Sequence, residues 1–346
     1  MLNRESPFNS CDAPLSTCVD GVLFDLDGVV YRGKHAVEHA VEAINALQVP
    51  HGYVTNNASR PPADVAAHLT ELGINVTEEE ITTSAQAAAG LVESTYGTDI
   101  TVLAVGGEGL RTALTERGLT LVSSADDSPG VVVQGTSSTL TWADLAEGVY
   151  AINRGADYIA TNLDSTMPTE RGMGPGNGAM VHAVAHATGV FPRRAAGKPD
   201  PQIFRHAAQR AQMHDAVVVG DRLDTDISGA REAGMAAMLV LTGVASAKDL
   251  LLSDPAERPT LLGHDLRDLH RAHPQVHARE TGWTCREAFA VVENEQLTVT
   301  ENERQATLSG AGEPVTISLD ALRAACAAAW MAEVELQCDR EIHISG

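Results

Sequence analysis

The chain has 346 residues, 44% of them apolar and 20% charged, which is ordinary for a globular protein of two or three domains. Its formal net charge of −22 disfavours nucleic acid and membrane surfaces as partners, because an acidic surface repels phosphate backbones and anionic lipids. The five cysteines form no Cys-x-x-Cys pair, the first 20 residues lack the apolar region of a secretory signal, and no run of about 18 apolar residues occurs. We therefore expect a cytoplasmic protein without a disulfide framework.

The stretch that best indicates function is a short apolar run, 22–24, followed by Asp25, Leu26, Asp27 and Gly28. Such a run predicts a buried parallel strand, and open α/β sheets hold their ligands at the C-terminal ends of strands. Along an extended backbone, the side chains of Asp25 and Asp27 point to the same face. Two carboxylates this close repel each other unless a cation lies between them, and a hard divalent ion is the ordinary solution. A solvated turn is the alternative.

A β-α-β unit is completed by a predicted helix over 36–47 and a second strand over 52–55. Ser59, which is followed closely by two prolines, marks the start of another helix. Thr55 and Asn56 therefore lie at the C-terminal end of a strand just ahead of a helix, where hydroxyl, amide and backbone N–H groups can bind phosphate oxygens. Helix capping is the alternative role for these side chains.

A second α/β series between about 82 and 188 has strands of its own and therefore predicts an inserted domain. Its predicted helices and strands cover 85–93, 100–105, 109–117, 131–134, 142–153 and 158–161. The loop from 162 to 178 is rich in glycine, and 174–179 formally matches a dinucleotide-binding fingerprint. Because no strand immediately precedes this match and Pro175 stiffens the turn, we expect no dinucleotide there.

A glycine and a lysine, Gly197 and Lys198, precede a predicted helix over 202–210. The pair does not belong to a P-loop, since Pro199 stands where a Ser or Thr should bind magnesium. In a chain this acidic, an anionic substrate needs a local positive pocket.

A third apolar strand, predicted over 216–219, ends in Gly220 and Asp221, with Asp226 a few residues further on. A helix over 227–233 and a strand over 237–241 follow, and this last strand is expected to close the sheet. The strand over 216–219 thus brings carboxylates to the same kind of sheet edge as the strand before Asp25.

Beyond Ser246 the sequence changes character, and prolines interrupt it. Four histidines lie along a charged segment but lack cysteine or acidic partners at ligand spacing, so they indicate a solvated helix and linker rather than a metal site. They are His264, His270, His273 and His277. From about Gly282 onward, strands are predicted over 288–292, 296–300 and 314–318, and an alanine-rich helix over 319–333. One apolar face of this helix needs a sheet or another subunit to cover it, namely Leu319, Leu322, Cys326, Trp330 and Val334.

Four segments, taken in this order, resemble the four motifs of the haloacid dehalogenase (HAD) superfamily of phosphohydrolases. They are Asp25-x-Asp27-Gly28, Thr55-Asn56, Gly197-Lys198-Pro199, and Gly220-Asp221 with Asp226. The insert between the second and third motifs resembles the C2a cap of subfamily IIA, the NagD-like and p-nitrophenylphosphatase-like branch. Three further stretches, 53–59, 161–164 and 175–178, are similar to that branch. The acidic chain with its C-terminal appendage is most similar to actinobacterial members, which include glycerol-3-phosphate phosphatases.

The resemblance implies an α/β fold with a doubly wound parallel-sheet HAD core at 18–81 and 189–272 and an inserted α/β C2a-type cap at 82–188. It also implies a small α+β appendage at 282–346, which resembles an acetyltransferase-like fold. No acetyl-CoA loop is evident in this appendage, so we expect it to be non-catalytic. At 134–137 the sequence reads Gln-Gly-Thr-Ser, where the family usually has a Gly-x-Asp in the cap.

The resemblance further implies an Mg²⁺-dependent phosphatase that works through an aspartyl-phosphate. Asp25 would be the nucleophile, and Asp27 would protonate the leaving alkoxide and then deprotonate the attacking water. Mg²⁺ would be held by Asp25, the Asp27 backbone carbonyl and Asp221, with Asp226 supporting these ligands. Lys198 would bind equatorial phosphate oxygens.

The Thr55 hydroxyl would bind these oxygens together with Lys198, and four further residues would complete the substrate site: Asn56, Asn57, Asn162 and Asp164. The expected substrates are small sugar or polyol phosphates, with glycerol 3-phosphate as a candidate and aryl phosphates as substrates in vitro. A homodimer is one expected assembly.

Other functions use the same features. A phosphomutase or phosphotransferase would share this core, although Asp27 favours release to water, and dehalogenases generally lack that second acid. A non-enzymatic alternative makes the C-terminal appendage a binding module and the core its scaffold.

Overall fold

The computed structural model describes residues 2, 7–169, 171–332 and 336–345. The chain divides into two compact units: Met1–Tyr31 with Ala36–His51 and Met213–Gly346, and Arg32–His35 with Gly52–Gln212. These units do not follow the core, cap and appendage limits expected from the sequence, so those limits stay a prediction. In the described part of the chain, no helix has both the length and the apolar character needed to cross a bilayer.

The first unit contains four parallel strands in the order β15 (Leu261–Gly263), β14 (Ala236–Val240), β13 (Ala216–Gly220) and β1 (Gly21–Phe24). Every residue of these strands is buried, which explains their continuous apolar runs. Phe24 pairs with Val219, so the residues that follow β1 and β13 emerge at the same edge. The sheet was expected to close with the strand near 237–241, but β15 extends it, because a run this short carries no periodic signal.

Helices α1 (Ala40–Asn45), α8 (Ser228–Ala233) and α9 (Ala247–Leu251) belong to the same unit. The helix expected over 36–47 is shorter than predicted, because Ala36 belongs to the short strand β3 (His35–Ala36), which pairs with β2 (Tyr31–Arg32), and His39 has a left-handed φ of 65° just before the helix begins. The helix after β13 begins with a π-helical turn, Leu223–Ile227.

The segment from His264 to His273 is packed rather than solvated, whereas His277 is exposed. A 3₁₀ helix, Leu266–His270, buries Leu266 and Leu269, and the side chain of His273 is only 4% exposed. The backbone of His273 exchanges two hydrogen bonds of 3.0 Å with Cys11, so the N-terminal segment covers this region. The expectation of a solvated helix and linker is therefore wrong, since a partner distant in sequence supplies the burial.

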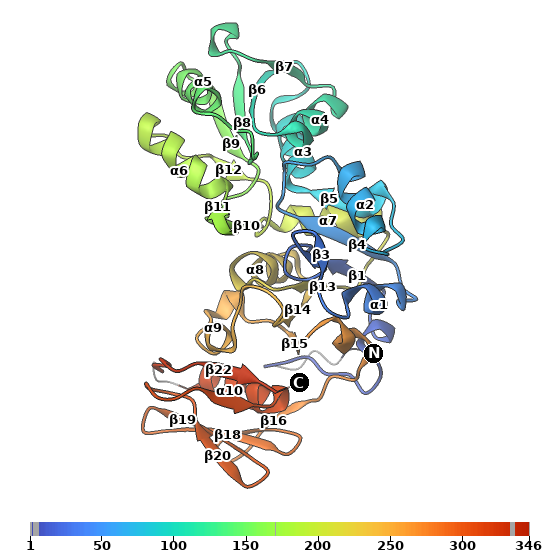
Figure 1. Cartoon of the computed structure of the whole chain (residues 1–346), viewed down its shortest axis with the longest axis vertical. Helices are drawn as coiled ribbons and strands as arrows, with labels where there is room; N and C mark the ends of the chain where they lie inside the picture. Colours follow the sequence, from blue (N-terminus) through green and yellow to red (C-terminus); the bar gives the residue numbers. More distant parts are fainter. Residues whose placement is uncertain (1, 3–6, 170, 333–335, 346) are drawn as a thin grey trace. The chain divides into compact units, whose positions relative to one another are not determined.

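The C-terminal part of the first unit is an antiparallel sheet with one long helix, α10 (Leu319–Met331), against it (Figure 1). The strands run in the order β16 (Val276–Ala278), β17 (Trp283–Cys285), β18 (Ala288–Glu293), β19 (Gln296–Glu301) and β20 (Arg304–Thr307). A separate parallel pair joins β21 (Val315–Ile317) to β22 (Ile342–Ile344).

Helix α10 is buried on nearly all sides rather than along one face, with every residue from Ala321 to Ala328 buried. Strands β17, β18 and β19 contact one side of it, and α9 and β15 also contact it. Its alanines allow two layers to approach one helix closely, which explains its composition. The predicted single apolar face was too narrow, and Val334 lies outside the described residues.

The second unit contains the parallel pair β4 (His51–Thr55) and β5 (Ile81–Thr83) and a separate five-stranded parallel sheet. That sheet runs in the order β12 (Arg194–Ala195), β9 (Asp157–Ala160), β8 (Val131–Gln134), β6 (Thr101–Val105) and β7 (Thr120–Val122). The helices of the unit are α2 (Pro62–Glu71), α3 (Ser84–Tyr96), α4 (Glu108–Glu116), α5 (Trp142–Asn153), α6 (Asn177–Thr188) and α7 (Pro201–Arg210).

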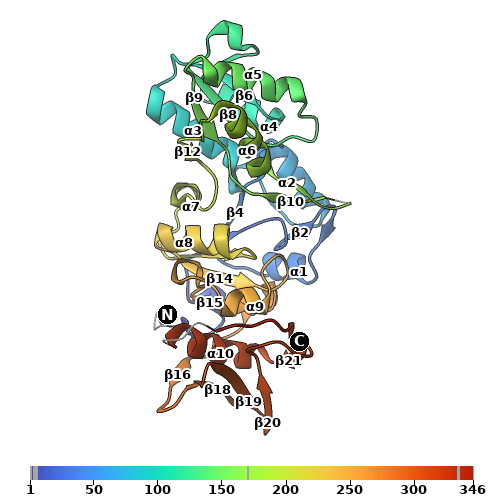
Figure 2. The ribbon, with the colours of Figure 1, turned by 90° about the vertical axis from the view of Figure 1, so that its left-hand side faces the viewer.

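Alternate residues of the five-stranded sheet face two hydrophobic clusters. Val102 and Ala104 of β6 pack with α3 and α4, while Leu103 and Val105 pack with α5 and α6. Helices therefore cover both faces of this sheet, as Figure 2 shows for the second unit. The predicted α/β series is confirmed, but β7, α6 and the hairpin of β10 (Thr166–Thr169) and β11 (Gly172–Pro175) were not predicted.

We predict that Arg323→Met lowers the free energy of unfolding by about 1–3 kcal/mol, because it removes a buried charged donor. Arg323 is 6% exposed, and its guanidinium donates to the Leu262 carbonyl and, over 2.6 Å, to Asp320. Arg286→Met is a matched control: Arg286 also donates to Asp320, over 3.0 Å, but its side chain is 59% exposed, so the loss should stay below about 1 kcal/mol. Urea unfolding measures both variants, and equal losses would contradict the prediction.

We also predict that acid weakens the fold through His273. Burial, and then Arg323, lower the pKa of His273 from 6.5 to about 4. Between these values the unfolded chain binds a proton that the folded chain does not, so stability falls as pH falls through this window. From pH 7 to pH 5 this should cost about 2 kcal/mol. Urea midpoints of His273→Gln should fall less over this range, and an unchanged pH dependence would rule out His273 as the cause.

Candidate active site

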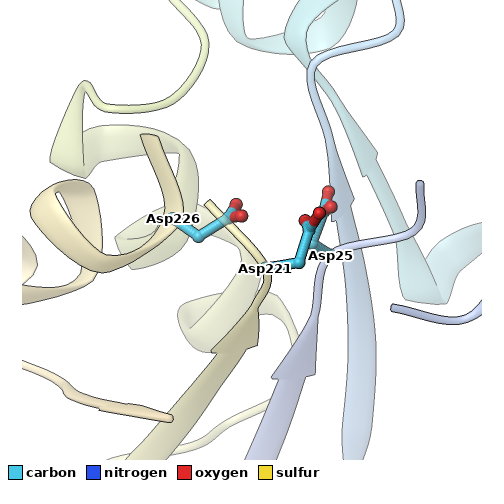
Figure 3. Close-up of side chains that lie close together, drawn as sticks. All are labelled: Asp25, Asp221 and Asp226. Atoms are coloured by element: carbon cyan, nitrogen blue, oxygen red, sulfur yellow. The ribbon is translucent and has the colours of Figure 1, made fainter. Parts of the chain in front are cut away.

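Three buried carboxylates gather in the first unit, and Figure 3 shows Asp226 directed toward Asp25 and Asp221. Asp25 follows β1, Asp221 follows β13, and Asp226 lies in the π-helical turn. Asp25 is 6% exposed, and the other two are fully buried. One oxygen from each residue lies within 4.8 Å of the others. Because buried carboxylates need a compensating cation and Mg²⁺ prefers oxygen ligands, this donor set fits Mg²⁺.

The backbone encloses the carboxylate of Asp221. The N–H of Val244 donates to Asp221 Oδ2 over 2.7 Å, and the N–H of Ala245 donates to the Asp221 carbonyl over 3.0 Å. A Cβ atom on Gly243 would lie 1.7 Å from this Oδ2, and one on Gly28 would lie 2.5 Å from it. Gly28 also has a φ of 91°, which favours glycine. These two glycines leave the space that the carboxylate occupies; Gly243 was not among the predicted site residues, and its only signal was its place after a strand.

The two remaining acidic residues of the predicted site in the first unit, Asp226 and Asp27, have different surroundings. Asp226 Oδ2 accepts a hydrogen bond of 3.1 Å from the N–H of Arg222, which holds this carboxylate in its turn. Asp27 is partly exposed, and its carboxylate is not among the grouped oxygens. Strand β1 ends at Phe24, but the N–H of Asp25 still donates to the Val219 carbonyl over 2.8 Å, and Asp27 forms an isolated β-bridge with Tyr31 before the turn at 28–30.

In the second unit, Thr55 and Asn57 have local partners. Thr55 ends β4, is 2% exposed, and accepts a hydrogen bond of 3.0 Å from the N–H of Asn57. Asn57 Oδ1 accepts bonds from the N–H and the hydroxyl of Ser59, over 2.9 and 2.6 Å. Ser59 does not cap α2, which begins at Pro62 after Pro61. These side chains therefore shape the turn after β4.

Asn56 and Lys198 meet although they are far apart in the sequence. Asn56 Oδ1 accepts the N–H of Lys198 over 2.8 Å, and Asn56 Nδ2 donates to the Lys198 carbonyl over 3.0 Å. The same Nδ2 donates to both carboxylate oxygens of Asp164 over 3.1 Å. Asn162 Nδ2 donates to the Asn56 carbonyl over 2.7 Å. The structure thus joins four predicted substrate-site residues that come from three sequence segments.

The glycine-rich stretch before α6 has a packing role. The N–H groups of Gly176 and Gly178 donate to the carbonyls of Ser165 and Asp164, each over 2.9 Å. A Cβ atom on Gly176 would lie 2.2 Å from the Asp164 carbonyl oxygen. The fingerprint-like spacing of these glycines therefore reflects close contact with the loop 162–165.

Comparison with known proteins gives two matches to family models. A model described as haloacid dehalogenase-like hydrolase matches residues 22–120, and a HAD-hydrolase-like model matches 195–269.

Individual relatives match over most of the chain. The chain is 47% identical, over 265 residues, to D-glycerol 3-phosphate phosphatase of Mycobacterium tuberculosis, which covers 76% of this chain and 75% of the relative. It is 39% identical to an acid sugar phosphatase of Staphylococcus haemolyticus, over 71% of this chain and 93% of the relative.

Solved structures are similar as well. The crystal structure of a glycerol phosphate phosphatase from Mycobacterium tuberculosis in complex with magnesium has a TM-score of 0.83 and 40% identity, covering 96% of both chains. A thermostable NPPase from Geobacillus stearothermophilus has a TM-score of 0.65 and 35% identity, over 72% of this chain and 97% of that one. The chain therefore belongs to the haloacid dehalogenase-like hydrolase family and, within it, to the NagD-like and p-nitrophenylphosphatase-like branch.

Proposed function

We propose that this protein is an Mg²⁺-dependent phosphatase that hydrolyses small phosphomonoesters, with glycerol 3-phosphate as its substrate. The observation that carries the proposal is the buried group of Asp25, Asp221 and Asp226, which provides the oxygen ligands that Mg²⁺ requires. The relatives named above include a D-glycerol 3-phosphate phosphatase and an acid sugar phosphatase, and one similar structure is a glycerol phosphate phosphatase in complex with magnesium.

The proposed reaction has two displacements. Asp25 attacks phosphorus, the ester P–O bond breaks, and Asp27 gives its proton to the leaving alkoxide. Asp27 then takes a proton from water, whose oxygen attacks the aspartyl-phosphate, so inorganic phosphate leaves and Asp25 is restored. Mg²⁺, when bound, supplies positive charge between nucleophile and phosphate. Lys198 and the Thr55 hydroxyl bind phosphate oxygens.

The choice of substrate is attributed to the insert at 82–188, whose loop carries Asn162 and Asp164. Their hydrogen bonds to Asn56 support a role of this loop in the substrate site. A cytoplasmic location and a homodimer complete the proposal. The location is supported by the five cysteines, which are all buried free thiols.

The first test measures phosphate release from glycerol 3-phosphate, other phosphomonoesters and p-nitrophenyl phosphate, with and without Mg²⁺. Asp25→Asn preserves shape and removes the nucleophile, so kcat should fall by at least about 10³-fold. Asp224→Asn is the control, since Asp224 lies two residues before Asp226 but has a side chain that is 56% exposed and paired with Arg222; its activity should stay within about threefold of wild type. Wild-type turnover by Asp25→Asn, or turnover without Mg²⁺, would refute the proposal.

A second prediction concerns the glycine beside the metal ligands. In Gly243→Ala the new methyl group collides with Asp221, so the carboxylate must move and the Mg²⁺ concentration for half-maximal activity should rise at least about tenfold. Gly90→Ala is the matched control, because Gly90 lies inside α3 and the nearest atom to its added Cβ would be 3.8 Å away. If both variants need the same Mg²⁺ concentration as wild type, Asp221 does not bind the metal.

A further inference from the structure

One carboxamide holds the backbone of Lys198 from both sides. Asn56 accepts from the Lys198 N–H and donates to the Lys198 carbonyl, and both residues are buried. A lysine side chain has many rotamers. Fixing its backbone therefore limits the positions that its ammonium group can reach. A pair of hydrogen bonds from one neutral amide fixes the Lys198 backbone without adding charge to it.

The orientation of the Asn56 amide follows from its neighbours. A flipped amide would place Oδ1 against the Asp164 carboxylate and the Lys198 carbonyl, and Nδ2 against the Lys198 N–H, so every bond would become repulsive. Aspartate lacks the donor and leucine lacks both groups. Among side chains of this length, only asparagine satisfies all three partners.

Gly197 makes this contact sterically possible. A Cβ atom on Gly197 would lie 2.4 Å from Asn56 Oδ1 and 2.7 Å from the Thr161 carbonyl oxygen. The glycine of the Gly-Lys pair therefore has a role that the sequence analysis did not give it. It lets the Asn56 side chain reach the backbone of the next residue.

Asn56 is itself held by its main chain. Its carbonyl accepts from Asn162 Nδ2 over 2.7 Å and from the Ser84 hydroxyl over 2.6 Å. Asn177 Nδ2, at the start of α6, donates to the Asn162 carbonyl over 2.8 Å. A chain of buried amides thus runs from α6 through the loop 162–164 to Lys198.

We propose that the side chain of Asn56 positions Lys198 and is not itself a ligand of the substrate. This inference rests on the proposed function, in which Lys198 binds phosphate. Every polar atom of the Asn56 side chain has a protein partner in the structure, so its effect on phosphate acts through Lys198. The sequence analysis expected Asn56 to contact the substrate. The proposal instead gives its side chain the role of positioning Lys198, which contacts the substrate.

The test is a double-mutant cycle with Asn56→Ala, Lys198→Ala and the double variant. It measures kcat/KM with p-nitrophenyl phosphate and the Kd of inorganic phosphate by calorimetry. Asn56→Ala should lower kcat/KM by about 30-fold in the wild-type background but by less than about threefold in the Lys198→Ala background. Additive losses would show that Asn56 acts independently of Lys198. Wild-type activity of the Asn56→Ala variant would show that the Asn56 side chain has no role in catalysis. Either result overturns the proposal.

Ser84→Ala is the matched control, since it removes one donor to the Asn56 carbonyl and leaves Asn162 in place; its loss should stay below about threefold. If Asn56→Ala does not fold, Gly197→Ala takes its place in the cycle, because it breaks the same contact and keeps the Asn56 side chain. Unchanged activity in Lys198→Ala would refute the proposed role of Lys198 itself. Additive losses beside an impaired Lys198→Ala would refute only the positioning role.

Discussion

Repulsion among Asp25, Asp221 and Asp226 is the constraint on which the chemistry of the first unit depends. Three carboxylates with oxygens within 4.8 Å of one another, all shielded from water, are stable together only if protons or a cation compensate their charge. The carboxylate of Asp221 cannot swing away, because Val244 binds it and two glycine backbones face it. Metal binding and folding are therefore linked, since a cation that binds only the folded arrangement stabilises it.

In the second unit, the Asn56 amide binds the backbone of Lys198 and also donates to the Asp164 carboxylate. Lys198 brings a positive charge into a strongly acidic chain, and another charged residue against its backbone would change the local potential. Asparagine side chains give direction without net charge, and the amides of Asn56 and Asn162 each donate and accept. The first unit thus contains a carboxylate group that needs a cation, and the second unit contains an amide network that binds the backbone of Lys198.

Close packing explains several sequence features that function does not. Gly176 and Gly178 allow α6 to begin against the loop 162–165, and the alanines of α10 allow layers to pack on more than one side of it. Arg323 and Trp330 extend from α10 to the carbonyls of Leu262 and Leu250, which ties the C-terminal part into the first unit. In a sequence, such glycines and alanines look like motifs or biased composition. The structure shows that they are small because neighbouring segments pack closely against them.

The sequence alone determined the strand ends and the residue types placed there. Asp25, Thr55 and Asp221 each follow a continuous apolar run, and that local pattern predicts a parallel strand whatever the rest of the chain does. Helices with regular periodicity, such as α5, were predicted at their observed bounds for the same reason.

Only the tertiary structure decided which of these residues touch. Three contacts join positions that are distant in the chain: the backbone bonds between Cys11 and His273, the close approach of Gly243 to Asp221, and the hydrogen bonds of Asn56 to Lys198. Their energies arise from hydrogen bonds and steric exclusion across space, which no local pattern encodes. The sequence therefore indicated which groups could act, and folding determined which groups hold them in place.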